Sequence, residues 1–189
     1  GKGMVVVIDC GVKNSIIKSL VARNLQVVQV PADCSADKIM EFEPDGILIS
    51  NGPGDPKKAG YVIDTTRKLI EYKLPMFGIC LGNQIIALAL GLDTYKLKFG
   101  HRGQNHPCID LATKRCYITS QNHGYAVKPD ENSDLKASFV NANDKSVEGV
   151  EHMKLPVFGV QFHPEAAPGP HDTGFLFDKF AKMIGACLR

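Results

Sequence analysis

The stretch that decides the fold is Phe77-Gly78-Ile79-Cys80-Leu81-Gly82-Asn83-Gln84. An apolar run over residues 74–79 leads into the cysteine, and a helical pattern of apolar residues follows over 85–90. This layout is typical of a nucleophile elbow, a sharp turn between a buried strand and a helix. The glycines fit such a turn, because a side chain in their place would clash with the strand or the helix. Cys80 is therefore either a catalytic nucleophile or a small buried hydrophobe in a strand-to-helix turn.

The chain before the elbow alternates between predicted strands and helices. Strands are expected over residues 5–8, 27–30 and 46–49, with helices over 15–24, from 35 onward and over 61–72. Continuous β-branched runs such as Val5-Val6-Val7-Ile8 are typical of strands that are buried on both faces. The alternation predicts an α/β fold with an open, doubly wound, mostly parallel sheet and flanking helices. Cys80 then lies at the C-terminal edge of the sheet, where such folds place their active sites.

After Gly91 the pattern changes. Additional short antiparallel strands are expected over residues 94–99, 116–119, 126–128, 136–140 and 147–151, with a polar loop over 100–107. Residues 157–162 predict a central strand that runs into His163-Pro164-Glu165, and a helix is expected over 173–188.

Composition restricts the class of protein. At 189 residues the chain predicts a single domain, 1–189, and its abrupt start suggests that it is cut from a longer chain. A net charge of +2 gives no reason to expect nucleic-acid binding, and no apolar stretch is long enough for a membrane span. The six cysteines form no C-x-x-C pair, so neither a disulfide framework nor a metal site is predicted, and no cofactor is expected. The cytoplasm is the expected compartment, with the mitochondrial matrix as the alternative.

A nucleophilic thiol needs a base, and the base needs an orienting partner. His163 follows a predicted central strand, so it lies at the same sheet edge as Cys80. Glu165 is two residues further on, which favours the triad Cys80–His163–Glu165. His123 is the alternative base, because it stands in the polar, turn-like segment 121–125.

Backbone N–H groups could stabilise an oxyanion. Leu81 follows the nucleophile directly, and Gly52 and Gly54 belong to the loop Ser50-Asn51-Gly52-Pro53-Gly54-Asp55-Pro56. Pro53 has no N–H and cannot donate. These groups fit acyl transfer from a carbonyl substrate, although the loop by itself also fits an ordinary strand-to-helix turn.

Three motifs together, G-x-C-x-G-x-Q at 78–84, N-G-P-G-D-P at 51–56 and H-P-E at 163–165, resemble class I glutamine amidotransferases. Within that class the chain is most similar to the glutaminase domain of carbamoyl phosphate synthetases, on the segments 98–107, 120–125 and 168–172. The resemblance extends from Val5 to the final helix.

The resemblance implies hydrolysis of L-glutamine to glutamate and ammonia through a γ-glutamyl thioester on Cys80. It also implies a set of glutamine-binding residues: Gly52, Gly54, Leu81, Gln84, Asn122, Gly124 and Tyr125. Its implied partners are an N-terminal small-subunit domain and an ATP-dependent synthetase that receives the ammonia, both absent from this sequence. Asn83 departs from the family, since many members have His there.

Three other functions also fit the sequence. A glutaminase-like module could be structural or regulatory without catalysis, although the three triad residues are present. The chain could also serve another amidotransferase, one that feeds GMP, anthranilate or aminodeoxychorismate synthesis. A cysteine hydrolase that cleaves peptides or γ-glutamyl chains is the third alternative.

Overall fold

The computed structural model describes residues 3–187 and has a mixed α/β fold. The strands are β1 (Met4–Asp9), β2 (Gln26–Pro31), β3 (Gly46–Ile49), β4 (Met76–Ile79), β5 (Asp93–Asp110), β6 (Cys116–Lys128), β7 (Leu135–Asn141), β8 (Val147–His152) and β9 (Val157–Val160). The helices are α1 (Asn14–Val21), α2 (Ala36–Met40), α3 (Gly60–Ile70), α4 (Leu81–Ala89) and α5 (Phe175–Cys187), with a short 3-10 helix, η1 (Pro56–Lys58).

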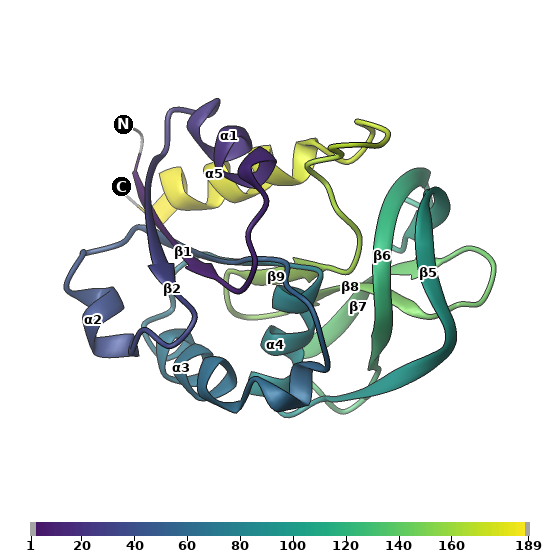
Figure 1. The fold of residues 1–189 in the computed structure, drawn as a ribbon, viewed down its shortest axis with the longest axis horizontal. Coiled ribbons are helices and arrows are strands. Elements are labelled where there is room, and N and C mark those ends of the chain that lie inside the picture. The colour runs from purple at the N-terminus through teal and green to yellow at the C-terminus, as the bar shows by residue number, and fades with distance from the viewer. Residues whose placement is uncertain (1–2, 188–189) are drawn as a thin grey trace.

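One nine-stranded sheet has the strand order β2-β1-β3-β4-β9-β8-β6-β5-β7. The pairings from β2 to β9 are parallel, and those among β9, β8, β6, β5 and β7 are antiparallel. Because β7 pairs with β8 as well as with β5, strands β5 to β8 close on themselves, as the right-hand side of Figure 1 shows. The α/β prediction is confirmed, but the sheet is mixed rather than mostly parallel. Its second half is closed rather than open, which leaves fewer unpaired strand edges.

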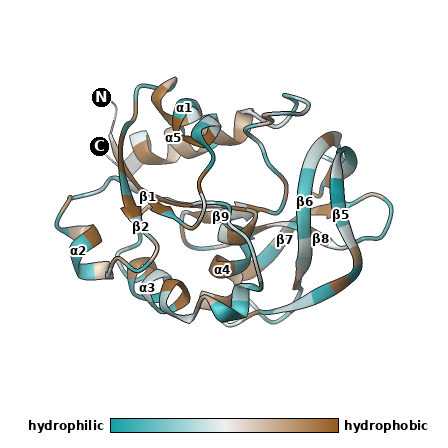
Figure 2. Cartoon of the chain, in the orientation of Figure 1, coloured by the Kyte–Doolittle hydropathy of each residue, from teal (hydrophilic) through white to brown (hydrophobic). Residues whose placement is uncertain are grey.

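The parallel strands lie between two helical layers (Figure 1). Alternate residues of β1 point to opposite faces: Val5 and Val7 pack toward α1 and α5, while Val6 and Ile8 pack toward α3 and α4. Burial on both faces explains the continuous apolar sequence of these strands. Figure 2 shows the contrast, since β1 is largely brown whereas β5 and β6 carry much more teal.

The second half contains longer strands than the sequence predicted. β5 has 18 residues and β6 has 13, and both the expected polar loop at 100–107 and the turn-like segment at 121–125 lie within them. The β5–β6 pairing is interrupted by register shifts between Lys96 and His101 and between Gly103 and His106. These irregularities break the period-2 alternation, so the sequence pattern is typical of a loop although the chain is paired.

Several predicted boundaries differ by a few residues. The helix expected over 15–24 ends at Val21, and Asn24 adopts a positive φ of 60° that a helix cannot continue through. The helix expected over 61–72 ends at Ile70, and the central strand expected over 157–162 ends at Val160. The last helix begins at Phe175, and residue 188 of its predicted range lies outside the described residues.

Within residues 3–187, no helix has both the length and the apolar composition required to cross a membrane.

Candidate active site

Cys80 stands at the turn between β4 and α4, as the elbow pattern predicted. Its φ of 55° and ψ of −102° are strained for a residue with a side chain. The backbone N–H of Cys80 donates to the carbonyl oxygen of Val160 at 2.8 Å, which ties the turn to the end of β9. The surrounding structure therefore holds the cysteine in a conformation that it would not adopt by itself.

Close backbone packing around the turn requires glycine at two positions. A Cβ on Gly78 would lie 2.5 Å from the carbonyl carbon of Gly82, and a Cβ on Gly82 would overlap the carbonyl oxygen of Ile49. Both neighbours are backbone atoms and cannot rotate away. The predicted role of these glycines at the elbow agrees with this geometry.

His163 and Glu165 meet beside this turn. The imidazole Nδ1 of His163 lies 2.8 Å from Oε1 of Glu165, and both side chains are buried. The backbone N–H of His163 donates to the carbonyl oxygen of Ser120 at 2.9 Å, which fixes the segment against β6. Lys13 places its Nζ 3.5 Å from the same Glu165 oxygen. Since Nδ1 is used by Glu165, Nε2 of His163 is the nitrogen left for the thiol.

The electrostatics of this pair favour its charged form. Burial lowers the pKa of His163, but hydrogen bonds to Cys80 and Glu165 and the charges of both partners outweigh it and raise the pKa to about 9. Burial raises the pKa of Glu165, but the hydrogen bond and charge of His163 outweigh it and leave that pKa below its ordinary value. The raised pKa strengthens the affinity of His163 for a proton, which suits the imidazole to accept the proton that the neighbouring thiol gives up.

A cavity of about 570 Å³ opens above the elbow. Its lining includes Cys80, His163 and six of the seven residues predicted to bind substrate: Gly52, Gly54, Gln84, Asn122, Gly124 and Tyr125. Leu81 does not line it, although its predicted contribution is a backbone N–H rather than a side chain. Glu165 lies behind His163 and does not line the cavity either.

The predicted oxyanion donors remain available. Among the described residues, the backbone N–H groups of Gly52, Gly54 and Leu81 make no hydrogen bond. A Cβ on Gly52 would overlap the carbonyl oxygen of Cys10, so this position also requires glycine. Gly54 has a φ of 95°, in the left-handed region that glycine adopts readily.

A buried amide network joins the elbow to the β6 wall, the side of the cavity that Asn122, Gly124 and Tyr125 of β6 form. The side-chain Nε2 of Gln84 donates to the carbonyl oxygen of Tyr125 and to Oε1 of Gln161, each at 3.0 Å. Gln161 Nε2 lies 3.7 Å from Cys80 Sγ, and the thiol in turn lies 3.9 Å from the carbonyl oxygen of Asn122. Sequence reasoning missed Gln161, although a glutamine inside an otherwise apolar strand pattern was a signal that could have found it.

The cavity lining also contains three cationic side chains that were not predicted from the sequence: Lys13, Lys96 and Arg102. Lys13 precedes α1, whereas Lys96 and Arg102 both belong to β5, and Asp55 is the only acidic residue among the lining residues described. Isolated basic residues are common on protein surfaces, so no signal in the sequence distinguished them. Together they make the cavity suited to a ligand that carries a carboxylate.

His123, the alternative base, has both ring nitrogens engaged elsewhere. Its Nδ1 lies 2.8 Å from the carbonyl oxygen of Tyr125, and its Nε2 lies 2.7 Å from Oε1 of Gln121. Burial lowers the pKa of His123 to about 4. The geometry therefore favours His163 as the base for Cys80.

Comparison with known proteins identifies the class to which this fold and site belong. The family model for glutamine amidotransferase class-I matches residues 6–183, so the chain belongs to that family. The resemblance inferred from the three motifs is thereby confirmed.

Two proteins with similar sequences are both named carbamoyl phosphate synthase small chain. The carbamoyl phosphate synthase small chain of Methanocaldococcus jannaschii is 56% identical over 183 residues, which cover 96% of this chain and 51% of that protein. The corresponding small chain of Methanopyrus kandleri is 56% identical over 185 residues, covering 97% and 51%. The chain thus spans about half the length of the curated relatives that it matches.

Solved structures share the fold at low sequence identity. A Thermoplasma acidophilum protein described as part of a GMP synthase has a TM-score of 0.79 at 21% identity, covering 97% of this chain and 94% of that one. A glutamine amidotransferase from Thermotoga maritima has a TM-score of 0.69 at 13% identity, covering 100% and 95%.

Proposed function

We propose that this chain hydrolyses L-glutamine to glutamate and ammonia. The observation that carries the proposal is that Cys80 and His163 line one cavity, with Glu165 behind the imidazole and the strained cysteine at the elbow. Membership of the glutamine amidotransferase family supplies the substrate class. The cationic residues Lys13, Lys96 and Arg102 in the cavity lining are suited to the α-carboxylate of glutamine.

In the first half of the reaction, Cys80 Sγ attacks the side-chain carboxamide carbon and its proton passes to Nε2 of His163. Backbone N–H groups of Leu81 and of the Gly52–Gly54 loop would stabilise the negative charge on the carboxamide oxygen. The carbon–nitrogen bond then breaks, and His163 returns a proton to the departing nitrogen, which leaves as ammonia. A γ-glutamyl thioester remains on Cys80.

In the second half, His163 takes a proton from a water molecule that attacks the thioester carbon. The carbon–sulfur bond breaks, His163 gives its proton to the departing Sγ, and glutamate is released with the thiol restored. Glu165 keeps the imidazole oriented with Nε2 toward the reacting atoms and stabilises its protonated form throughout.

The names of the relatives support a proposal for the destination of the ammonia. We infer that a longer protein containing this chain passes ammonia to an ATP-dependent synthetase partner for carbamoyl phosphate synthesis in the cytoplasm. The names and the greater length of the relatives support this inference, since each is a carbamoyl phosphate synthase small chain about twice as long. The extra length leaves room for the expected N-terminal domain.

Glutamate release from glutamine tests the proposal. Wild-type protein should produce glutamate, Cys80→Ser should not, and Cys34→Ser, which changes a thiol outside the cavity, should match the wild type. Each sample is also assayed with the ATP-dependent synthetase of a carbamoyl phosphate synthetase, which is expected to increase the rate. If wild type releases no glutamate even with that partner, the chain is a structural module and the proposal is wrong.

A further inference from the structure

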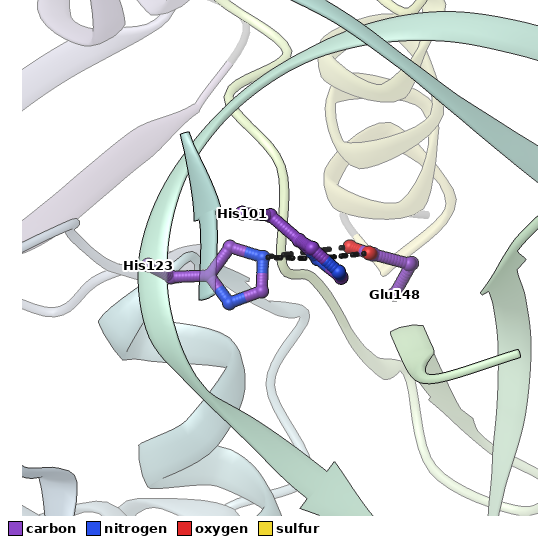
Figure 3. A group of neighbouring side chains, drawn as sticks. All are labelled: His101, His123 and Glu148. Atoms are coloured by element: carbon purple, nitrogen blue, oxygen red, sulfur yellow. Dashed lines mark hydrogen bonds and ion pairs between the residues drawn. The ribbon is translucent and has the colours of Figure 1, made fainter. Parts of the chain in front are cut away.

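A second cluster of titratable side chains lies beneath the β6 wall of the cavity. His101 of β5, His123 of β6 and Glu148 of β8 converge there, as Figure 3 shows. Their exposed fractions are 8%, 7% and 0%. The mechanism proposed above uses none of the three as an acid, a base or a nucleophile, so a buried group of this kind needs a separate explanation.

The inward-facing atoms are spaced like ligands of one metal ion. His101 Nδ1 lies 3.2 Å from His123 Nε2 and 3.0 Å from Glu148 Oε1, and His123 Nε2 lies 3.9 Å from Glu148 Oε2. In a tetrahedral zinc site with metal–ligand bonds of about 2.0–2.1 Å, neighbouring ligand atoms are about 3.3–3.4 Å apart. The 3.2 Å between the two histidine nitrogens is close to that value and the 3.9 Å between His123 Nε2 and Glu148 Oε2 is above it, whereas the 3.0 Å contact of His101 is to the other oxygen of Glu148.

The outward-facing nitrogens of both histidines are held by oxygen acceptors. His101 Nε2 lies 2.7 Å from Oδ2 of Asp144, and His123 Nδ1 lies 2.8 Å from the carbonyl oxygen of Tyr125. Metal-binding histidines almost always donate their second ring N–H to a carboxylate or a backbone carbonyl. In the tautomers with both outward-facing nitrogens protonated, the lone pairs of His101 Nδ1 and His123 Nε2 face each other and Glu148.

Glu148 offers an oxygen that no protein group satisfies. Its Oε1 accepts a hydrogen bond from Asn141 Nδ2 at 3.1 Å, whereas its Oε2 is buried without a hydrogen-bond partner in the described structure. A buried carboxylate oxygen left unpaired is costly. A protonated His101 would donate a hydrogen bond to Oε1 but would leave Oε2 without a partner.

Gln121 adds a second unfavourable contact that a cation would relieve. Its Oε1 lies 2.7 Å from His123 Nε2. When His123 Nδ1 carries the proton and donates to the carbonyl oxygen of Tyr125, Nε2 is an acceptor as well, so two acceptors face each other. Turning the amide over would place that oxygen against the hydroxyl oxygen of Thr119, and this hydroxyl already donates to the carbonyl oxygen of His106 at 2.7 Å.

We propose that His101 Nδ1, His123 Nε2, Glu148 Oε2 and Gln121 Oε1 bind one Zn²⁺ ion. Imidazole nitrogens with a carboxylate oxygen are a donor set that zinc accepts, and four protein ligands without an open position are typical of a structural site. The ion would join β5, β6 and β8, which are consecutive neighbours in the sheet.

The position of the ion suggests its effect on the cavity, a consequence that rests on the proposed function. His123 lines the cavity together with its neighbours Asn122 and Gly124. A metal that fixes His123 would hold this segment in place for glutamine, so its loss should raise KM several-fold more than it lowers kcat.

Zinc stoichiometry tests the site without any assay of glutamine hydrolysis. The Cys80→Ser background removes the catalytic thiol as a competing ligand. Protein freed of metal by a chelator is dialysed against Zn²⁺, and the bound metal is measured by elemental analysis. We expect one zinc per chain in this background and in its His171→Asn control, which removes an exposed histidine, and at least tenfold weaker binding in Glu148→Gln and His101→Asn.

X-ray absorption of the zinc-loaded Cys80→Ser protein gives a readout that does not depend on whether these variants fold. We expect a shell of nitrogen and oxygen at about 2.0–2.1 Å with imidazole scattering and no sulfur. Failure to bind stoichiometric zinc, sulfur at about 2.3 Å, or zinc binding that Glu148→Gln leaves unchanged would each overturn the proposal. Because none of these results involves glutamine, they stand whether or not the proposed glutaminase activity is found.

Discussion

Nδ1 of His163 and Oε1 of Glu165 lie 2.8 Å apart, behind the cavity wall, while Cys80 stands on the other side of the imidazole ring. This contact fixes which nitrogen faces the thiol. A histidine that must first accept a proton and then return it needs its other nitrogen held in one state, and the buried carboxylate does this.

Glu165→Gln tests this orienting role. The amide keeps the size of the side chain but removes the charge that stabilises the imidazolium, so kcat should fall by on the order of 100-fold or more while KM for glutamine changes little. Steady-state kinetics of glutamate release measures both constants. A variant with wild-type kcat would contradict the role given to Glu165, and Glu71→Gln, on the surface after α3, serves as the matched control.

The raised pKa of His163 predicts a pH-dependent contribution to stability. Its folded value of about 9 lies above its ordinary value of 6.5, so the contribution is fully present below about pH 6.5 and is lost as pH rises through 9. The free energy of unfolding of wild type should therefore exceed that of His163→Asn by more at about pH 6 than at about pH 9.5.

Urea unfolding at the two pH values measures this difference. Glu165 has the opposite dependence, because its pKa is lowered and its contribution is lost only as pH falls through that lowered value. Titration of Glu165 therefore does not mask the change in the free energy of unfolding between about pH 6 and about pH 9.5. A gap between wild type and His163→Asn that stays constant or widens toward alkaline pH would contradict the prediction.

Gly82→Ala should destabilise the elbow. The new Cβ would overlap the carbonyl oxygen of Ile49 in β3, which is backbone and cannot move without disturbing the sheet. We expect a loss of about 2–3 kcal/mol in the free energy of unfolding, with activity reduced as well. Gly60→Ala is the control, because a Cβ there meets no atom within 4 Å, and alanine at this first position of α3 should change the free energy of unfolding by less than about 0.5 kcal/mol. Equal stability of the two variants would argue against this packing.

Gln161→Leu should disturb the buried amide network. Gln84 Nε2 would lose one of its two acceptors and the donor near Cys80 Sγ would disappear. A buried polar group left unpaired costs about 1–3 kcal/mol in the free energy of unfolding. Gln26→Leu, on the exposed edge of β2, should change it by less than about 0.5 kcal/mol. Chemical denaturation measures both, and a neutral Gln161→Leu would exclude a stabilising role for the network.

The parts of the fold that rest on local patterns could be predicted from the sequence. The apolar run of β1 and the glycines around Cys80 report burial and close packing directly, because each requires a particular residue type at one place. The proximity of Cys80 and His163 could be predicted because the ends of neighbouring parallel strands lie at one edge of the sheet. The pairings of β4 with both β3 and β9 are consistent with that reasoning.

The remaining features depend on contacts between distant segments. The closure of β5 to β8 arises because β7 pairs with two partners, which no periodicity within one strand reveals. Residues 100–107 look like a loop because register shifts interrupt their alternation. Likewise, Lys13 and Arg102 line the cavity only because separate segments fold toward it.

The central claim is that Cys80 forms a γ-glutamyl thioester, and mass spectrometry tests it most directly. Protein mixed with glutamine is quenched in acid within the first turnovers and digested for peptide analysis. We predict one added glutamyl group on the peptide that contains Cys80, no adduct in Cys80→Ser, and release of the group as glutamate when the quench is delayed. Steady glutamate production by Cys80→Ser, or a glutamyl group carried by another residue, would contradict the account.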